Sequence, residues 1–196
     1  MVRQSDILWC VKPAEPVTPK GRRTRESLLD AGEAVAAAEG LAGVTIAAVT
    51  KHAGVAKGTF YVYFSDRDVF VDALHQRFYE QVNDAVANAV AGLEPGGELL
   101  AAAAEAYLDV CLAHRAMKAL VFDTRALGHL TTTMEQRHEL FAKLAEPGLR
   151  SAGVPAPRVA ARLFVALTSE TALIELEAGK RVSGARAILR AFIASL

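Results

Sequence analysis

The sequence contains few of the residues that build disulfide-rich or turn-rich folds. It has two cysteines, Cys10 and Cys111, together with 14 glycines and 7 prolines in 196 residues. Two cysteines cannot form a disulfide framework, so we expect free thiols in a reducing compartment. The scarcity of glycine and proline argues against a β fold with many turns, and runs of alanine favour helices.

Long apolar segments are also missing. No stretch reaches the ~18 uncharged apolar residues that a membrane span needs. The apolar run of residues 7–11 is shorter than the core of a signal peptide, which takes about 7–15 residues. We therefore expect a cytoplasmic protein with no membrane partner.

The charges balance, with 22 Lys and Arg residues against 22 Asp and Glu residues. This balance excludes a polybasic or polyacidic protein, so any surface for nucleic acid has to be local. Residues 1–25 are one such local region, because they hold six basic and two acidic residues. Three prolines there break helical periodicity, and we interpret residues 1–21 as a flexible basic tail. Apolar residues make up 52% of the chain, enough for a sizeable core.

From Thr24 onward the apolar residues recur with helical spacing, which predicts an all-α fold. Thr24, Thr45 and Ser65 are the expected N-caps of the first, second and fourth helices, and Ser65 has capping-box spacing to Asp68. No segment alternates long enough for a strand. The expected helices are 24–40, 45–53, 56–64, 65–91, 98–114, 118–127, 132–147, 157–179 and 183–196.

The most informative stretch is residues 44–64, which predicts two short helices joined by a tight turn. Gly54 suits the turn, and the apolar residues Ile46, Val49, Val55 and Phe60 can form a small core. The second short helix then carries Lys57, Thr59, Tyr61 and Tyr63 away from that core. Such side chains suit a helix in the DNA major groove, since they supply phosphate contacts and base-edge donors. The alternative is two surface helices whose tyrosines fill space.

These residues resemble the TetR family, the tetracycline-repressor-like regulators of bacteria, over roughly residues 22–74. The motif is carried by residues 45–46, 49, 53–55, 57–64 and 67. The resemblance implies a DNA-binding domain at 22–80, with its helix-turn-helix motif at 45–64, and an effector-binding and dimerisation domain at 81–196. It also implies DNA contacts by Thr45, Lys57, Gly58, Thr59, Tyr61, Tyr63 and Arg67. Ala56 departs from the family, which commonly has a Ser cap there.

A small-molecule effector, apolar or aromatic, is a further implication of the resemblance. Small side chains on the helix from Glu98 can leave space for a pocket. The candidate lining residues are Tyr107, Cys111, His114 and Phe122. Apolar stripes on the last two helices, such as Leu163 with Leu167 and Leu189 with Ile193, predict a homodimer.

The alternative interpretation is an enzyme or a helical binding module with a degenerate helix-turn-helix. The sequence contains no Gly-rich phosphate loop, and no Ser-His-Asp set can be singled out. Glu135 and His138 have the spacing of some di-metal bundles, but a second copy of the pair is missing. We therefore expect no catalytic activity, metal or cofactor. The expected function is repression from a palindromic operator in double-stranded DNA.

Overall fold

The structure is a computed structural model that describes residues 18–126, 131–151 and 153–196, with the side chains of 122–126, 131–138, 140 and 144 left out. Within these residues all regular elements are α-helices, which confirms the predicted all-α fold. None of the described helices has the length and apolar content of a membrane span. The helices are α1 (Pro19–Gly43), α2 (Ile46–Ala53), α3 (Lys57–Tyr63), α4 (Arg67–Ala89), α5 (Gly97–Ala113), α6 (Arg115–Ala126), α7 (Thr131–Ser151), α8 (Pro157–Ala178) and α9 (Ser183–Ala194).

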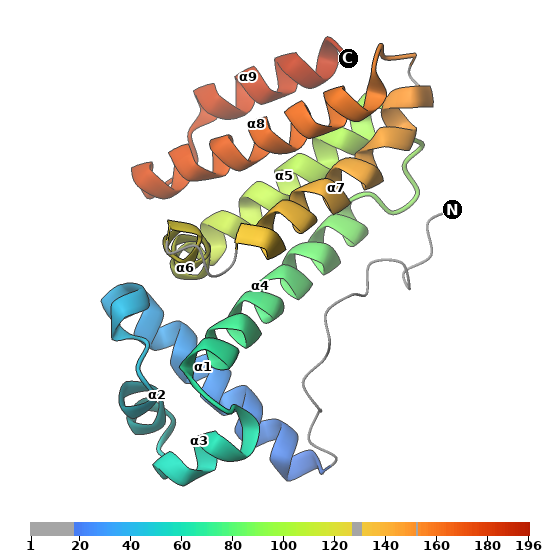
Figure 1. Cartoon of the computed structure of the whole chain (residues 1–196). Helices are drawn as coiled ribbons and strands as arrows, with labels where there is room; N and C mark the ends of the chain where they lie inside the picture. The colour runs from blue at the N-terminus through green and yellow to red at the C-terminus, as the bar shows by residue number, and fades with distance from the viewer. Residues whose placement is uncertain (1–17, 127–130, 152) are drawn as a thin grey trace.

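Helices α1 to α3 gather at one end of the molecule, and α4 leads from them to the remaining helices (Figure 1). In the larger part, α4 packs against α5, and α7 packs against α8. Helix α6 packs against α1, so the two parts touch through α6 as well as through α4. The expected domain boundary at residue 80 falls inside α4, which therefore belongs to both parts.

The first helix begins earlier than its sequence pattern indicates. Thr18 is the N-cap, and its Oγ1 accepts a hydrogen bond from the Gly21 amide at 3.1 Å. Pro19 occupies the first helical turn, where its missing N–H leaves no bond unmade. The prediction of Thr24 as the cap was wrong, since the Thr24 hydroxyl donates to the Lys20 carbonyl inside the helix. Residues 1–17 of the predicted tail lie outside the described residues.

Two other helix boundaries also differ from the prediction. Asp66, not Ser65, caps α4: its Oδ1 accepts from the Val69 amide at 2.9 Å, while the Ser65 hydroxyl donates to Oδ2. The bond from Val69 lowers the pKa of Asp66. Helix α7 continues through Pro147 to Ser151 instead of ending there.

A cluster of three phenylalanines holds the N-terminal helices together. Phe60 lies 5.2 Å from Phe70 and 5.4 Å from Phe64 between ring centroids, and all three rings are buried. Helix α1 reaches this cluster at Gly32, where a Cβ would come within 2.6 Å of the Phe70 ring. Because aromatic pairs at these distances favour defined orientations, the cluster fixes α3 relative to α4.

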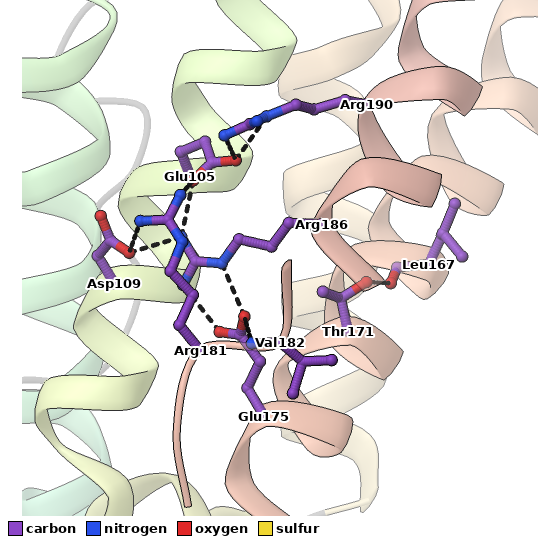
Figure 2. A network of polar contacts seen from close by, with 9 residues as sticks. All are labelled: Glu105, Asp109, Leu167, Thr171, Glu175, Arg181, Val182, Arg186 and Arg190. Atoms are coloured by element: carbon purple, nitrogen blue, oxygen red, sulfur yellow. Dashed lines mark hydrogen bonds and ion pairs between the residues drawn. The ribbon is translucent and has the colours of Figure 1, made fainter. Parts of the chain in front are cut away.

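A buried network of charges joins α5, α8 and α9 (Figure 2). Arg186 of α9 is 1% exposed, and its Nε and Nη2 each donate to the Glu175 carboxylate of α8 at 2.8 Å. Its Nη1 donates to Glu105 and Asp109 of α5. The Val182 amide, just before α9, also donates to Glu175. This network fixes α9 on the bundle through directional bonds in addition to apolar packing.

The apolar stripe of α9 faces inward, which corrects part of the dimer prediction. Leu189 and Ile193 are buried, and Phe192 and Leu196 pack against the same core. This face is already covered within one chain, so it is not available to a second copy. The large apolar side chains that stay exposed on these two helices are Val159, Leu163 and Ile174 on α8 and Ile188 on α9.

Candidate DNA-binding interface

The turn between α2 and α3 forms as its sequence predicts. Thr45 caps α2, and its Oγ1 accepts from the Ala48 amide at 3.1 Å. Gly54 ends α2 in the left-handed conformation, with φ of 66°, which residues with a Cβ adopt at a cost. The Val55 amide then donates to the Thr50 carbonyl, and Val55 packs against the core. This turn places α3 at the outer end of the N-terminal helices (Figure 1).

Helix α3 has one buried face and one exposed face. Phe60 is fully buried, and Tyr63 packs partly against the core. On the opposite side Lys57, Gly58, Tyr61 and Val62 are exposed. Their spacing places them on one stripe of the helix.

The exposed stripe combines several chemical types. Lys57 supplies a positive charge, and Tyr61, 48% exposed, supplies a hydroxyl. Gly58 has open space around the position of a Cβ. Thr59, at the edge of the stripe, is half-buried, and Thr45, the N-cap of α2, is exposed. Ala56 before α3 provides no side-chain cap, as its sequence predicts. A helix with this stripe offers phosphate contacts, and its backbone at Gly58, which carries no side chain, can approach base edges.

Arg67 has a structural role that its sequence position does not reveal. Its Nε donates to the Val44 carbonyl and its Nη2 to the Leu41 carbonyl, both at 2.7 Å. Its Nη1 lies 3.7 Å from the Asp68 carboxylate. The guanidinium therefore ties the start of α4 to the end of α1, and a DNA contact by Arg67 stays a prediction.

Other basic residues near these helices were not among the predicted contacts. Lys51 and His52 are exposed at the end of α2, and Lys20 and Arg23 are exposed in the first turns of α1. Arg25 differs, because its guanidinium carbon lies 5.4 Å from the centroid of the Phe64 ring. The sequence signal for Lys51 and His52 was their position just before the turn glycine.

The predicted effector residues Tyr107 and Cys111 lie together in α5, beside a lysine that sequence reasoning missed. Lys118 of α6 is 2% exposed, and its Nζ donates to the Tyr107 hydroxyl at 2.6 Å. Burial and then the neighbouring Cys111 raise the pKa of Tyr107. Burial also raises the pKa of the Cys111 thiol. A phenol, a thiol and an amine thus form a polar cluster inside an apolar bundle.

The remaining predicted pocket residues are less closely joined to this cluster. His114 lies where α5 ends, and its carbonyl accepts from the Lys118 amide. The side chain of Phe122 lies outside the described residues, as do those of Glu135 and His138. Among the residues whose side chains the structure describes, no group of three His, Cys, Asp or Glu could hold a metal ion.

Comparisons with known proteins identify the N-terminal helices. The family of bacterial regulatory proteins, tetR family, matches residues 28–74, which cover most of α1, all of α2 and α3, and the first part of α4. A search of curated proteins returns no match.

Solved structures match over nearly the whole chain. A TetR-like transcriptional regulator from Rhodococcus sp. RHA1 superposes with a TM-score of 0.74 at 19% identity, covering 87% of this chain and 93% of that one. The fatty acid degradation regulator FadR from Bacillus halodurans gives a TM-score of 0.71 at 18% identity, covering 91% and 95%. RolR in complex with resorcinol gives 0.62 at 19% identity, covering 89% and 87%.

These likenesses establish a shared fold, and the family match lies on the helices that carry the helix-turn-helix. The chain therefore carries a DNA-binding domain of the tetR family of bacterial regulatory proteins at its N-terminal end, and nearly its whole length shares the fold of solved TetR-like transcriptional regulators.

Proposed function

We propose that the protein is a repressor that binds a near-palindromic operator as a homodimer and is released by a small molecule. The observation that carries this proposal is the exposed stripe of α3, with Lys57 and Tyr61 beside the bare backbone at Gly58. Lys57 and Tyr61 contact phosphates, which position the helix. Thr59 and Tyr63 supply further contacts at the edge of the stripe, and Thr45 meets a phosphate at the start of α2.

Variants of the two phosphate contacts test this placement. Lys57→Ala is expected to lower the slope of log affinity against log salt by about one, because one phosphate contact is lost. Tyr61→Phe is expected to weaken binding to specific and non-specific DNA by the same factor. Fluorescence anisotropy over a range of salt concentrations measures both effects.

The control for Lys57 is Lys180→Ala, which removes a second exposed lysine beyond the end of α8 and should leave the slope unchanged. Equal salt slopes for the wild type and Lys57→Ala would show that α3 does not face the phosphates. The absence of salt-dependent binding to DNA would instead favour the helical binding module or enzyme.

The dimer contact is proposed on α8 and α9, where Val159, Leu163, Ile174 and Ile188 remain exposed. Exposed apolar groups on adjacent helices favour association with another apolar surface. In a two-fold dimer the same patch meets itself, and the two α3 helices face the same side of the DNA. Their separation would then be about one DNA turn, roughly 34–36 Å.

The effector site is proposed at the cluster of Tyr107, Cys111 and Lys118, between α5 and α6. A small aromatic molecule with a hydroxyl or acidic group fits this chemistry, because apolar walls would hold the ring and the cluster would bond its oxygen. RolR, which shares the fold, binds resorcinol, a phenol of this kind. Helix α6 packs against α1, so a shift of α6 on binding would reach the DNA-binding helices.

A ligand found by thermal-shift screening of phenols and aromatic acids provides the test of regulation. It is expected to lower operator affinity by about 5–150-fold, and operator DNA should weaken ligand binding by the same factor. Titrating the ligand into the protein–operator complex, and DNA into the protein–ligand complex, measures both couplings. Lys118→Met should reduce ligand affinity without changing DNA binding of the ligand-free protein. A saturating ligand with no effect on operator affinity would contradict the release mechanism.

A further inference from the structure

Val62 is an apolar residue whose side chain is exposed and does not contribute to the core. Its side chain is 74% exposed, more than any other large apolar side chain in the described part of the chain. It lies in α3, where a β-branched residue loses side-chain freedom and adds little to helix stability. Burial within the chain therefore does not account for an apolar side chain at this position.

The surroundings of Val62 form a small apolar strip. Gly58 lies one turn earlier on the same stripe, and a Cβ at Gly58 would meet nothing within 4 Å. Lys57 and Tyr61 are the exposed polar residues alongside. The two isopropyl methyls of Val62 thus stand beside bare backbone, with groups suited to phosphates next to them.

We propose that Val62 determines operator specificity by contacting the C5-methyl group of a thymine in the major groove. The thymine methyl is an apolar group on the major-groove edge of a base pair, and apolar side chains read it by contact. Cytosine and adenine present polar amino groups there, so Val62 would leave those groups without a partner. This inference rests on the proposed function, in which α3 enters the major groove. It goes further by naming the base, thymine, that Val62 selects.

The position of Val62 separates it from the proposed dimer surface. The other strongly exposed aliphatic side chains, Val159, Leu163 and Ile188, lie on α8 and α9, at the far end of the molecule from α3 (Figure 1). In the N-terminal helices the ring of Tyr61, which adjoins Val62 in sequence, supplies the remaining exposed area of large hydrophobic side chains, although its hydroxyl is polar. The exposed apolar surface of this end therefore coincides with the face that meets DNA.

The test replaces single thymines with deoxyuridine, which lacks only the methyl group. The operator is first selected from a random DNA pool with the full chain, and each thymine of the half-site is then replaced in turn. At one thymine, the wild type is expected to lose about four-fold in affinity per half-site, the factor for one methyl group removed from water. Replacement in both half-sites should cost about fifteen-fold.

Val62→Ala is the matching protein variant. It is expected to bind the thymine and deoxyuridine operators with equal affinity, close to that of the wild type for the deoxyuridine operator. Lys57→Ala is the control: it should weaken binding yet keep the wild-type ratio between the two operators. Because Val62 is exposed and alanine favours helix, the thermal midpoint of Val62→Ala should not fall.

Two outcomes overturn the inference. Either no thymine shows a deoxyuridine effect with the wild type, or Val62→Ala keeps the full ratio. If Lys57→Ala still lowers the salt slope in these cases, the proposed function stands and only the role of Val62 fails. If no operator is selected and binding does not depend on salt, both the inference and the proposed function fail.

Discussion

Glu175→Ala is expected to destabilise the protein strongly, by roughly 3 kcal/mol in the free energy of unfolding. Glu175 is 2% exposed and accepts two hydrogen bonds from Arg186 and one from the Val182 amide. Alanine would leave the Val182 donor without its acceptor and the buried guanidinium with only Glu105 and Asp109 as partners. Urea denaturation followed by circular dichroism measures the loss.

The matched control is Glu146→Ala, which breaks an ion pair with the exposed Arg150 on α7. Pairs of this kind contribute about 0–1 kcal/mol, so the control should unfold near the wild-type midpoint. Equal losses in Glu175→Ala and Glu146→Ala would show that the buried network does not hold α9 in place.

The network also gives the protein a defined response to acid. Burial alone would raise the pKa of Glu175, but the bonds from Arg186 and Val182 hold it below its ordinary value. The same balance lowers the pKa of Glu105, which bonds Arg186 and Arg190. A carboxylate whose pKa is lower in the folded state contributes stability above its unfolded pKa, and that stability is lost as pH falls through the folded pKa.

Leu163→Glu is expected to have the largest effect on DNA binding. Leu163 is 56% exposed on α8, so the change should leave each protomer folded. In a two-fold dimer it would place two like charges in an apolar contact and separate the protomers. A monomer engages one half-site, and losing the second linked contact costs about 10²–10⁴-fold in affinity. Analytical ultracentrifugation and operator titration measure the two effects.

Ala38→Glu is the control for Leu163→Glu, since it adds the same charge at an exposed position on α1. It should remain dimeric at the concentration where Leu163→Glu sediments as a monomer. A Leu163→Glu protein that stays dimeric would place the interface elsewhere on the surface.

The helix-turn-helix could be predicted from the sequence because its signals are local. Thr45 caps α2 through a bond three residues away, and Gly54 adopts the left-handed conformation that its position demanded. The buried residues Val49 and Phe60 follow the helical period that identified them. In each of these cases a few neighbouring residues decide the structure.

The helix starts of α1 and α4 were predicted wrongly because a neighbouring residue could also act as the N-cap. Thr18 and Asp66 each cap a helix that the sequence assigned to Thr24 and Ser65, since all four side chains are competent caps. Pro19 is one of the three prolines that interrupt the helical periodicity of residues 1–25, yet it lies in the first turn of α1, a position that suits proline.

Other features depend on contacts between distant segments, which periodicity does not show. The α9 stripe faces its own bundle, because Arg186 bonds residues more than 70 positions away in α5 and thereby sets the rotation of the helix. Lys118 was missed for a similar reason. A single lysine in an amphipathic pattern predicts exposure, whereas its partner Tyr107 belongs to another helix.

The bonds of Arg67 have a consequence for how the protein can move. Its guanidinium holds the carbonyls of Leu41 and Val44, so the start of α4 cannot tilt away without taking the end of α1 with it. Arg77, further along α4, pairs with Glu26, Asp30 and Glu33 of α1. Helices α1 and α4 are thus joined at two places, through Arg67 and through Arg77, and would move as one rigid body. An effector would then change the distance between the two DNA-binding domains of a dimer without changing either domain. Operators with altered half-site spacing would be the DNA whose binding responds most to the effector.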